Sequence, residues 1–322
     1  MGHTHKVLAG FFLGSFALTY GYLLNTETIL TFNRVGTASQ QAEIIFVGDI
    51  MLDRTIWTIL EKEGADAVFG EIRSSLKEAD FVVGNLEGPI THFASESVGT
   101  LPGEEGNTRF TFNPSVAAIL ADVGFKILAI GNNHIADFGQ EGIAETKKYL
   151  EAVDITPVGD PFVDSVEPVL ETVRGIKIGF AAYDEFINSD AEKTRATITR
   201  ASEAGADFVV VLAHWGDEYE SAPPPRIRQL AATFAGAGAD LIIGTHSHVI
   251  GEVEDIGTTR VYYSLGNFIF DQYWDASVRC GLVVSLTLTK TGATTTASYR
   301  EQKVGLLRSG ATVINCSSDH SA

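Results

Sequence analysis

The sequence contains few cysteines and has a clear deficit of positive charge. Cys280 and Cys316 are the two cysteines among 322 residues, and neither belongs to a C-x-x-C pair, which excludes a disulfide-rich scaffold and a cysteine-based zinc site. Lysine and arginine number 23 against 41 acidic residues, so the net charge of −18 disfavours nucleic acid as a partner. There is no low-complexity tract, and the 45% apolar content indicates a folded chain.

Charge is also missing from residues 7–24, which are 18 consecutive uncharged and mostly apolar residues. Such a segment is at the short end of a transmembrane helix, and it also suits a signal peptide with a small-residue site at 36–38. We favour an uncleaved single-pass anchor. Lys6 precedes the segment, which favours a cytoplasmic tail of residues 1–6. Residues 25–42 are then a linker, and the rest of the chain lies outside the cytoplasm.

Short apolar runs alternate with helical patterns from residue 43 to residue 308, and residues 309–322 are expected to be a C-terminal tail. This alternation predicts an α/β domain with a covered sheet. Strands are expected at 43–47, 80–83, 126–130, 177–182, 207–213, 240–243, 261–265 and 281–288. Helices are expected within 56–79 and at 116–123, 140–152 and 226–237. Outside the cytoplasm the two cysteines can pair; a buried Cys280 and an unpaired Cys316 are the alternative.

Five predicted strands end in side chains that can bind a metal or move a proton. In chain order these residues are Asp49, Asn85, Glu87, Asn133, His134, His214, His246 and His248. Taken singly, Asp49 also suits a helix N-cap and the asparagines suit turns. Because ligands of open α/β sheets bind at the carboxyl ends of the strands, the joint pattern predicts one metal site at one edge.

Carboxylate, amide and imidazole ligands without a thiolate suit one or two divalent ions such as Mn, Zn or Fe. Glu87 can bridge two ions, which is the arrangement for in-line displacement at phosphorus. Asp137 follows His134 by three residues and can hydrogen-bond its imidazole. His134 can then protonate a leaving oxygen, so His134 and Asp137 are the predicted catalytic pair.

Four residues are candidates for substrate contacts: Arg54, Asn85, Trp215 and Asn267. Arg54 can grip a phosphate or carboxylate, and a surface charge is the rival interpretation. Trp215, with Tyr219, can form a wall of the substrate site or pack in the core. Asn267 lies at an expected turn that can line the cleft or pack beside it.

Six segments together resemble the CapA-type poly-γ-glutamate capsule synthesis family, which is similar in pattern to the calcineurin-like metallophosphatases. They are GDIMLDR (48–54), GNLEGPIT (84–91), NNHIADFG (132–139), AHWGDEY (213–219), GTHSHV (244–249) and YSLGNFIFDQ (263–272). They occur in the order of the family and extend over residues 43–289. The resemblance implies a metallophosphatase-like four-layer αββα sandwich behind an N-terminal transmembrane helix.

The resemblance also implies roles for the residues at the strand ends. Asp49 and His248 match ligands of a first metal, and Glu87 stands at the bridging position. His214 and His246 match ligands of a second metal, Asn133 matches a metal-binding asparagine, and His134 matches the catalytic histidine. The metallophosphatases have a histidine two residues after the first aspartate, where this chain has Met51, a very weak ligand for hard metals. One ion and two ions are therefore both open.

Two functions remain open at this point. The first is a metal-dependent hydrolase of the phosphoesterase type, which acts on an anionic polymer or a phosphoester in capsule, poly-γ-glutamate or related exopolymer synthesis. The alternative is a non-hydrolytic accessory protein that holds the polymer through its metal. Other membrane proteins of capsule synthesis are the partners expected in that case.

Overall fold

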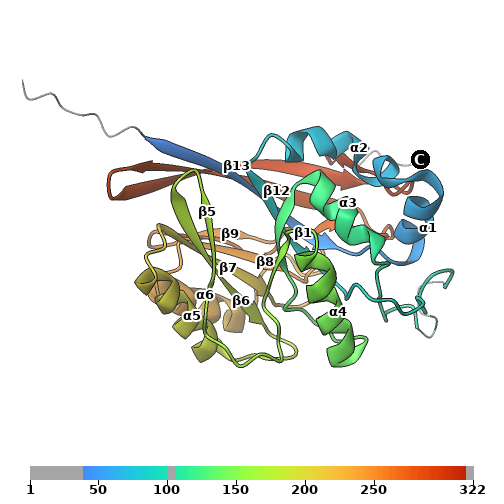
Figure 1. The fold of residues 1–322 in the computed structure, drawn as a ribbon, viewed down its shortest axis with the longest axis horizontal. Coiled ribbons are helices and arrows are strands. Elements are labelled where there is room, and N and C mark those ends of the chain that lie inside the picture. Colours follow the sequence, from blue (N-terminus) through green and yellow to red (C-terminus); the bar gives the residue numbers. More distant parts are fainter. Residues whose placement is uncertain (1–38, 101–103, 105, 317–322) are drawn as a thin grey trace, which may run out of the picture. The chain divides into compact units, whose positions relative to one another are not determined.

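Two β-sheets pack face to face, and helices cover their outer faces (Figure 1). The computed structural model describes residues 39–100, 104 and 106–316. Within these residues no helix is long and apolar enough to cross a membrane. The predicted cytoplasmic tail 1–6 and membrane segment 7–24 lie outside the described residues, as does most of the linker.

The strands and helices follow the predicted alternation, with additional elements. The strands are β1 (Gln40–Ile50), β2 (Phe81–Leu86), β3 (Phe125–Ala129), β4 (Thr156–Val158), β5 (Val169–Val173), β6 (Ile176–Asp184), β7 (Phe208–His214), β8 (Leu241–Thr245), β9 (Val253–Ile256), β10 (Thr259–Tyr262), β11 (Asn267–Ile269), β12 (Cys280–Thr291), β13 (Thr294–Leu306) and β14 (Thr312–Ile314). The helices are α1 (Arg54–Glu63), α2 (Ala65–Leu76), α3 (Ser115–Val123), α4 (Gly139–Glu151), α5 (Ala191–Glu203) and α6 (Pro225–Gly236).

The parallel strands at the centre of each sheet fix the position of the candidate site. The first sheet has the order β14-β13-β12-β1-β2-β3-β4, with β11 also paired to β1. Its strands β1 to β4 are parallel, and β12 runs antiparallel to β1. The second sheet has the order β5-β6-β7-β8-β10-β9, in which β6, β7, β8 and β10 are parallel. Each sheet therefore presents several carboxyl ends at one edge.

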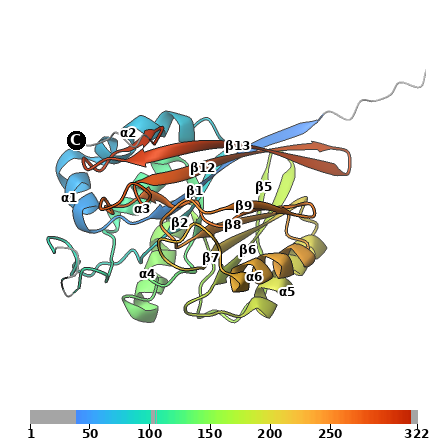
Figure 2. The same cartoon turned by 180° about the vertical axis from the view of Figure 1, so that it is seen from behind.

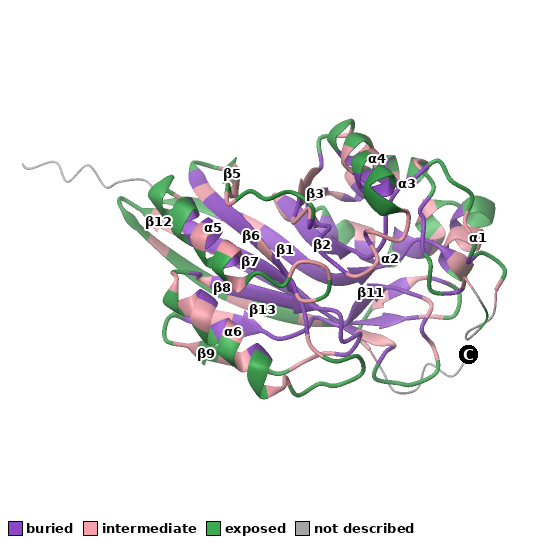
Figure 3. Cartoon of the chain, turned by 90° about the horizontal axis from the view of Figure 1, so that it is seen from below, coloured by how far each residue is buried: buried purple, intermediate pink, exposed green. Residues whose placement is uncertain are grey.

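Three apolar layers hold the sandwich together. Helices α1 to α4 bury Val68, Leu120 and other residues against the first sheet, and α5 and α6 bury Ile198 and Phe234 against the second. Between the sheets lies a third cluster that includes Phe46 and Phe180. Figure 3 shows buried strands between helices whose outer faces are exposed. The four-layer α/β sandwich that the sequence predicted is therefore observed.

Local sequence explains where several helices begin and end. The side chain of Asp53 accepts a hydrogen bond from Arg54 N at the start of α1, so this aspartate is the N-cap. Helix α3 ends at Gly124, whose φ of +106° suits a glycine. Helix α6 has Pro225 in its first turn, where a missing N–H costs little.

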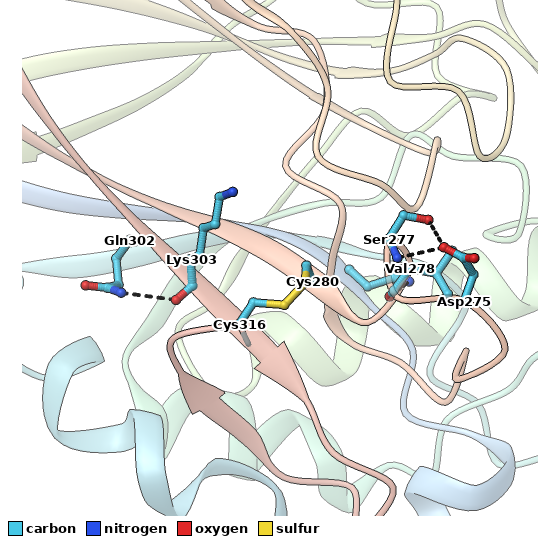
Figure 4. The surroundings of a disulfide bond; sticks show 8 residues. Asp275, Ser277, Val278, Cys280, Gln302, Lys303 and Cys316 are labelled. Carbon is cyan, nitrogen blue, oxygen red and sulfur yellow. Dashed lines mark hydrogen bonds between the residues drawn. A yellow bond between two sulfur atoms is a disulfide. The ribbon is translucent and has the colours of Figure 1, made fainter. Parts of the chain in front are cut away.

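Part of the predicted C-terminal tail, Thr312–Ile314, forms strand β14 of the first sheet. β14 pairs with β13, which forms a long hairpin with β12 (Figure 2). Cys316 follows β14 and forms a disulfide bond with Cys280 at the start of β12, with Cα atoms 5.6 Å apart (Figure 4). Of the two alternatives left open by the sequence, the structure therefore has the paired one.

Candidate metal centre

The polar side chains at the strand ends meet at one edge of the sandwich. In the first sheet Asp49 of β1 is in register with Asn85 of β2, and Glu87 follows β2 directly. In the second sheet His214 ends β7 beside Thr245 of β8. Glu87 and His248 are linked across the sheets, with Glu87 Oε1 3.5 Å from His248 Nε2. The edge expected from the sequence is thus common to both sheets.

Asp49, Glu87 and His214 form a buried group whose ligand atoms all lie within 4.8 Å of one another. Among the described residues, neither carboxylate oxygen of Glu87 has a hydrogen-bond partner, although both are buried. Burial raises the pKa of Glu87 well above its usual value, and the nearby charge of Asp49 raises it further. A buried carboxylate is costly unless a cation compensates it, so these donors fit a divalent metal ion.

His214 and His246 are held in the neutral form that binds metals. His246 Nδ1 lies 3.2 Å from His214 Nε2. Burial lowers the pKa of His214 well below its usual value, and the neighbouring His246 lowers it further. Burial also lowers the pKa of His246 to about 4, with a contribution from His248. Both imidazoles are therefore unprotonated at neutral pH, as ligation requires.

His248 faces both carboxylates of the cluster. Its Nδ1 lies 3.4 Å from Asp49 Oδ2 and 3.0 Å from the side-chain oxygen of Asn267. Both His246 and His248 have positive φ, at +94° and +59°, which is uncommon for residues other than glycine. Such a turn allows two imidazoles separated by one residue to face the same cluster.

The loop after β3 brings Asn133, His134 and Asp137 to the cluster. The Asn133 side-chain oxygen lies 2.8 Å from His214 Nε2. His134 Nδ1 lies 3.0 Å from Asp137 Oδ2, the contact that their spacing predicted. Asp137 also accepts a hydrogen bond from Phe110 N at 2.8 Å, which fixes the carboxylate. All six predicted ligands and both predicted catalytic residues therefore lie in one region.

Two buried asparagines connect these groups. The Asn85 amide nitrogen donates to Asp49 Oδ1 at 2.8 Å and lies 3.3 Å from His214 Nδ1. Asn132, which was not predicted as a site residue, donates to Asn85 Oδ1 at 3.1 Å and accepts from His134 N. Its position directly before Asn133 in the segment NNH is the sequence feature that could have indicated a role in the site. Asn85 thus orients the cluster from within rather than from the substrate side.

The predicted substrate contacts occupy three different environments. Arg54 pairs with Asp271 and lines a cleft beside the cluster. Asn267 is fully buried and holds His248. Trp215 is 1% exposed, donates to the Tyr263 carbonyl at 3.0 Å and packs under α6. Of the two interpretations that the sequence left open for Trp215, a substrate wall and core packing, the structure therefore has core packing, because Trp215 follows the buried strand β7 and joins the cluster under α5 and α6.

Phe186 and Met51 add details that the sequence did not predict. Phe186, in the loop after β6, is 43% exposed and its ring centroid lies 4.2 Å from that of His246. Its loop has no pattern that points to the site. Met51 is fully buried in the cluster under α1 to α4, and its sulfur accepts from Asp53 N at 3.1 Å.

Comparisons with known proteins identify the family of this chain. A family model described as bacterial capsule synthesis protein PGA_cap matches residues 43–272. The PGA biosynthesis protein CapA of Bacillus subtilis is 33% identical over 264 residues, which cover 77% of this chain and 68% of that protein. The capsule biosynthesis protein CapA of Bacillus anthracis is 30% identical over 264 residues, covering 76% of this chain and 64% of that protein.

Among solved structures, the sulfate thiohydrolase SoxB of Thermus thermophilus matches 74% of this chain and 42% of its own, with 15% identity and a TM-score of 0.44. The chain spans about two thirds of the length of the two CapA proteins. The family model covers well over half of the chain. On these matches, the chain belongs to the bacterial capsule synthesis protein family PGA_cap, the family that its six segments resemble.

Proposed function

We propose that this protein is a membrane-anchored, extracytoplasmic metal-dependent hydrolase with a phosphoesterase-type centre, which acts in the synthesis of a capsule or a related exopolymer. The observation that carries the proposal is the buried Asp49–Glu87–His214 group beside the His134–Asp137 pair. Membership in the capsule synthesis family supports the biological context. The apolar segment 7–24 supports the anchor.

The six predicted ligands would together hold one or two divalent ions, and they differ in charge. Asp49 and Glu87 supply negative charge, and neither oxygen of Glu87 has a hydrogen-bond partner among the described residues, so both can meet a cation. His214 and His246 supply neutral imidazoles from the second sheet. What a divalent ion provides in such a centre is Lewis acidity toward an ester oxygen and a lower pKa for bound water.

His134 is placed to move a proton. Because Asp137 accepts at Nδ1, the neutral imidazole has its proton there and its Nε2 is free to accept one. His134 lines the cleft, so protonated Nε2 can pass the proton to the oxygen of a leaving group. Two hydrogen bonds hold the loop in position: the Asp137 carboxylate accepts from Phe110 N, and the Asn132 side-chain oxygen accepts from His134 N.

Turnover by the full-length chain tests the proposal. We would load the protein with Mn²⁺, Zn²⁺ or Fe²⁺ and assay p-nitrophenyl phosphate, bis-p-nitrophenyl phosphate and poly-γ-glutamate beside a His134→Ala variant with equal metal content. We expect the variant to be about 10²–10⁴-fold slower, since general acid catalysis contributes that much. Wild-type turnover no faster than that of the variant on every substrate would contradict the hydrolase.

Met51 favours a second candidate function, a non-hydrolytic accessory protein that holds an exopolymer through the metal. It stands where metallophosphatases have a histidine of the first metal position, and its sulfur accepts a hydrogen bond from Asp53 N in the core. In this case polymer binding disappears on chelation with EDTA while no turnover is seen. Polymer binding that is unchanged by EDTA would contradict this alternative.

A further inference from the structure

A cleft of about 500 Å³ opens beside the candidate metal centre. His134 and His248 form part of its wall, so a ligand in the cleft contacts both the predicted proton donor and a predicted metal ligand. The wall also contains Tyr219, from the loop after β7, and Trp274, from the loop after β11. The cleft is therefore the place where the part of a substrate next to the reacting bond would lie.

Tyr219 and Trp274 are large aromatic side chains that are left open to solvent. They are 46% and 57% exposed, whereas Trp215 is 1% exposed. The two exposed rings have centroids 5.9 Å apart and planes at 77°, and the Tyr219 ring is 6.0 Å from that of His248. Exposed aromatic surface in a concave site indicates ligand binding, because exposing it without a partner is unfavourable.

The backbone ties Tyr219 to the metal ligands. Its φ is +66°, in the left-handed region that residues other than glycine seldom adopt. Its N–H donates to the Ser247 carbonyl at 2.7 Å, and Ser247 lies between His246 and His248. The turn that carries two predicted ligands thus also fixes the aromatic ring next to them.

Charge indicates what kind of ligand the cleft accepts. The described charged residues of its wall, apart from the histidines, are two arginines and two carboxylates: Arg54, Arg308, Glu218 and Asp271. Arg54 and Asp271 form an ion pair with each other. A polyanion would find no excess of positive charge in this wall, and the whole chain has a net charge of −18. Without a metal ion, the cleft therefore suits a neutral group better than a polyanionic peptide.

We propose that Tyr219 and Trp274 form a subsite for a neutral sugar ring, so that the substrate carries a sugar next to the bond that faces the metal ligands. The C–H groups of a pyranose pack on an aromatic face, while Thr55 and Thr108, which are exposed in the same wall, offer hydroxyl groups. Rings at 77° form a corner for a puckered ring and cannot sandwich a flat heterocycle between parallel faces. The inference rests on the proposed function, because it names the ligand class of the same site.

Binding without turnover tests this subsite separately from the hydrolase. Calorimetric titration of the full-length, EDTA-treated protein would use three neutral tetrasaccharides: chitotetraose, cellotetraose and maltotetraose. We expect at least one to bind, Trp274→Ala to weaken it at least about tenfold, and Trp274→Phe to weaken it less. Phe162→Ala is the matched control, because Phe162 is 50% exposed and lines a different cavity. It should leave the affinity unchanged.

Three results would overturn the sugar subsite. The first is no binding of any of the three tetrasaccharides to the wild type, and the second is binding that Trp274→Ala leaves unchanged in a variant that still unfolds cooperatively. The third is tighter binding of adenosine monophosphate or poly-γ-glutamate with the same dependence on Trp274, which would assign the wall to a flat base or a polyanion. Since no step requires hydrolysis, an inactive protein that binds the sugar leaves this inference standing.

Discussion

Replacing Glu87 by glutamine should stabilise the metal-free protein and weaken its stabilisation by a metal ion. In the metal-free state the Glu87 carboxyl is fully buried beside Asp49, and its oxygens have no hydrogen-bond partner among the described residues. An unsatisfied buried polar group costs about 1–3 kcal/mol, and a charged group costs more. Glu87→Gln removes the charge with little change in shape, so we expect it to stabilise the metal-free protein by about 1–3 kcal/mol.

The metal-loaded state should respond in the opposite direction. A metal at 100 times its Kd stabilises the wild type by about 2.7 kcal/mol, or about 5–10 °C in Tm for a domain of this size. Glu87→Gln should lose most of that increase, because it removes one of the two negative charges that would compensate the cation in the buried site. Thermal unfolding followed by circular dichroism, with EDTA or with excess Mn²⁺, measures both effects. Glu145→Gln is the control, since Glu145 pairs with His92 outside the cluster.

The raised pKa of Glu87 fixes the direction in which its contribution to the free energy of unfolding changes with pH. Because the folded state raises the pKa of Glu87, it binds a proton more tightly than the unfolded state does. The contribution of Glu87, measured as the free energy of unfolding of metal-free wild type minus that of Glu87→Gln, should therefore fall as pH rises from about 4.5 through the folded-state pKa. A variant that is less stable than wild type in EDTA, or that keeps the full increase with Mn²⁺, would refute the reasoning.

Other predictions follow from single contacts. Asn132→Ala removes buried hydrogen bonds that join the loop after β3 to β2, and should lower the free energy of unfolding by about 2–3 kcal/mol in urea denaturation. Reduction of Cys280–Cys316, 36 residues apart, should lower it by about 3–4 kcal/mol, and a double serine variant should match the reduced protein. The pKa of His246 is about 4 in the folded state, so its contribution, measured as the free energy of unfolding of metal-free wild type minus that of His246→Gln, should fall as pH falls from 6.5 toward 4.

Much of the fold was predictable because apolar strands and their turns are coded locally. Strands β2, β3, β7 and β8 are short and mostly apolar, each is followed by or ends in polar residues, and each lies where the sequence indicated. β13 escaped prediction because its residues are mostly exposed and polar, and its pairing with β12 along twelve positions defines it. Helix α5 was missed because AEKTRATITRASE is polar and rich in threonine and has few apolar positions.

The site was predictable to the level of which strand ends converge. Its details depend on tertiary structure. Trp215 directly follows β7, whose residues are all buried. The sequence therefore does not show whether its side chain faces the core or the cleft. Phe186 and Trp274 lie in loops without a periodic pattern, so their approach to the cluster depends on the folded loops. The pairing of Cys280 with Cys316 likewise requires β14 to return along β13.

Metal content per chain tests the central claim most directly. Elemental analysis of the purified protein, and of the protein reloaded with Mn²⁺, Zn²⁺ or Fe²⁺ and then desalted, would be compared with His214→Ala and the control Glu145→Gln. The account predicts at least one divalent ion per chain in the wild type and the control, and a clear loss in His214→Ala, which removes one member of the Asp49–Glu87–His214 group. A reloaded wild type that retains no ion, or a His214→Ala variant that retains the full content, would contradict it.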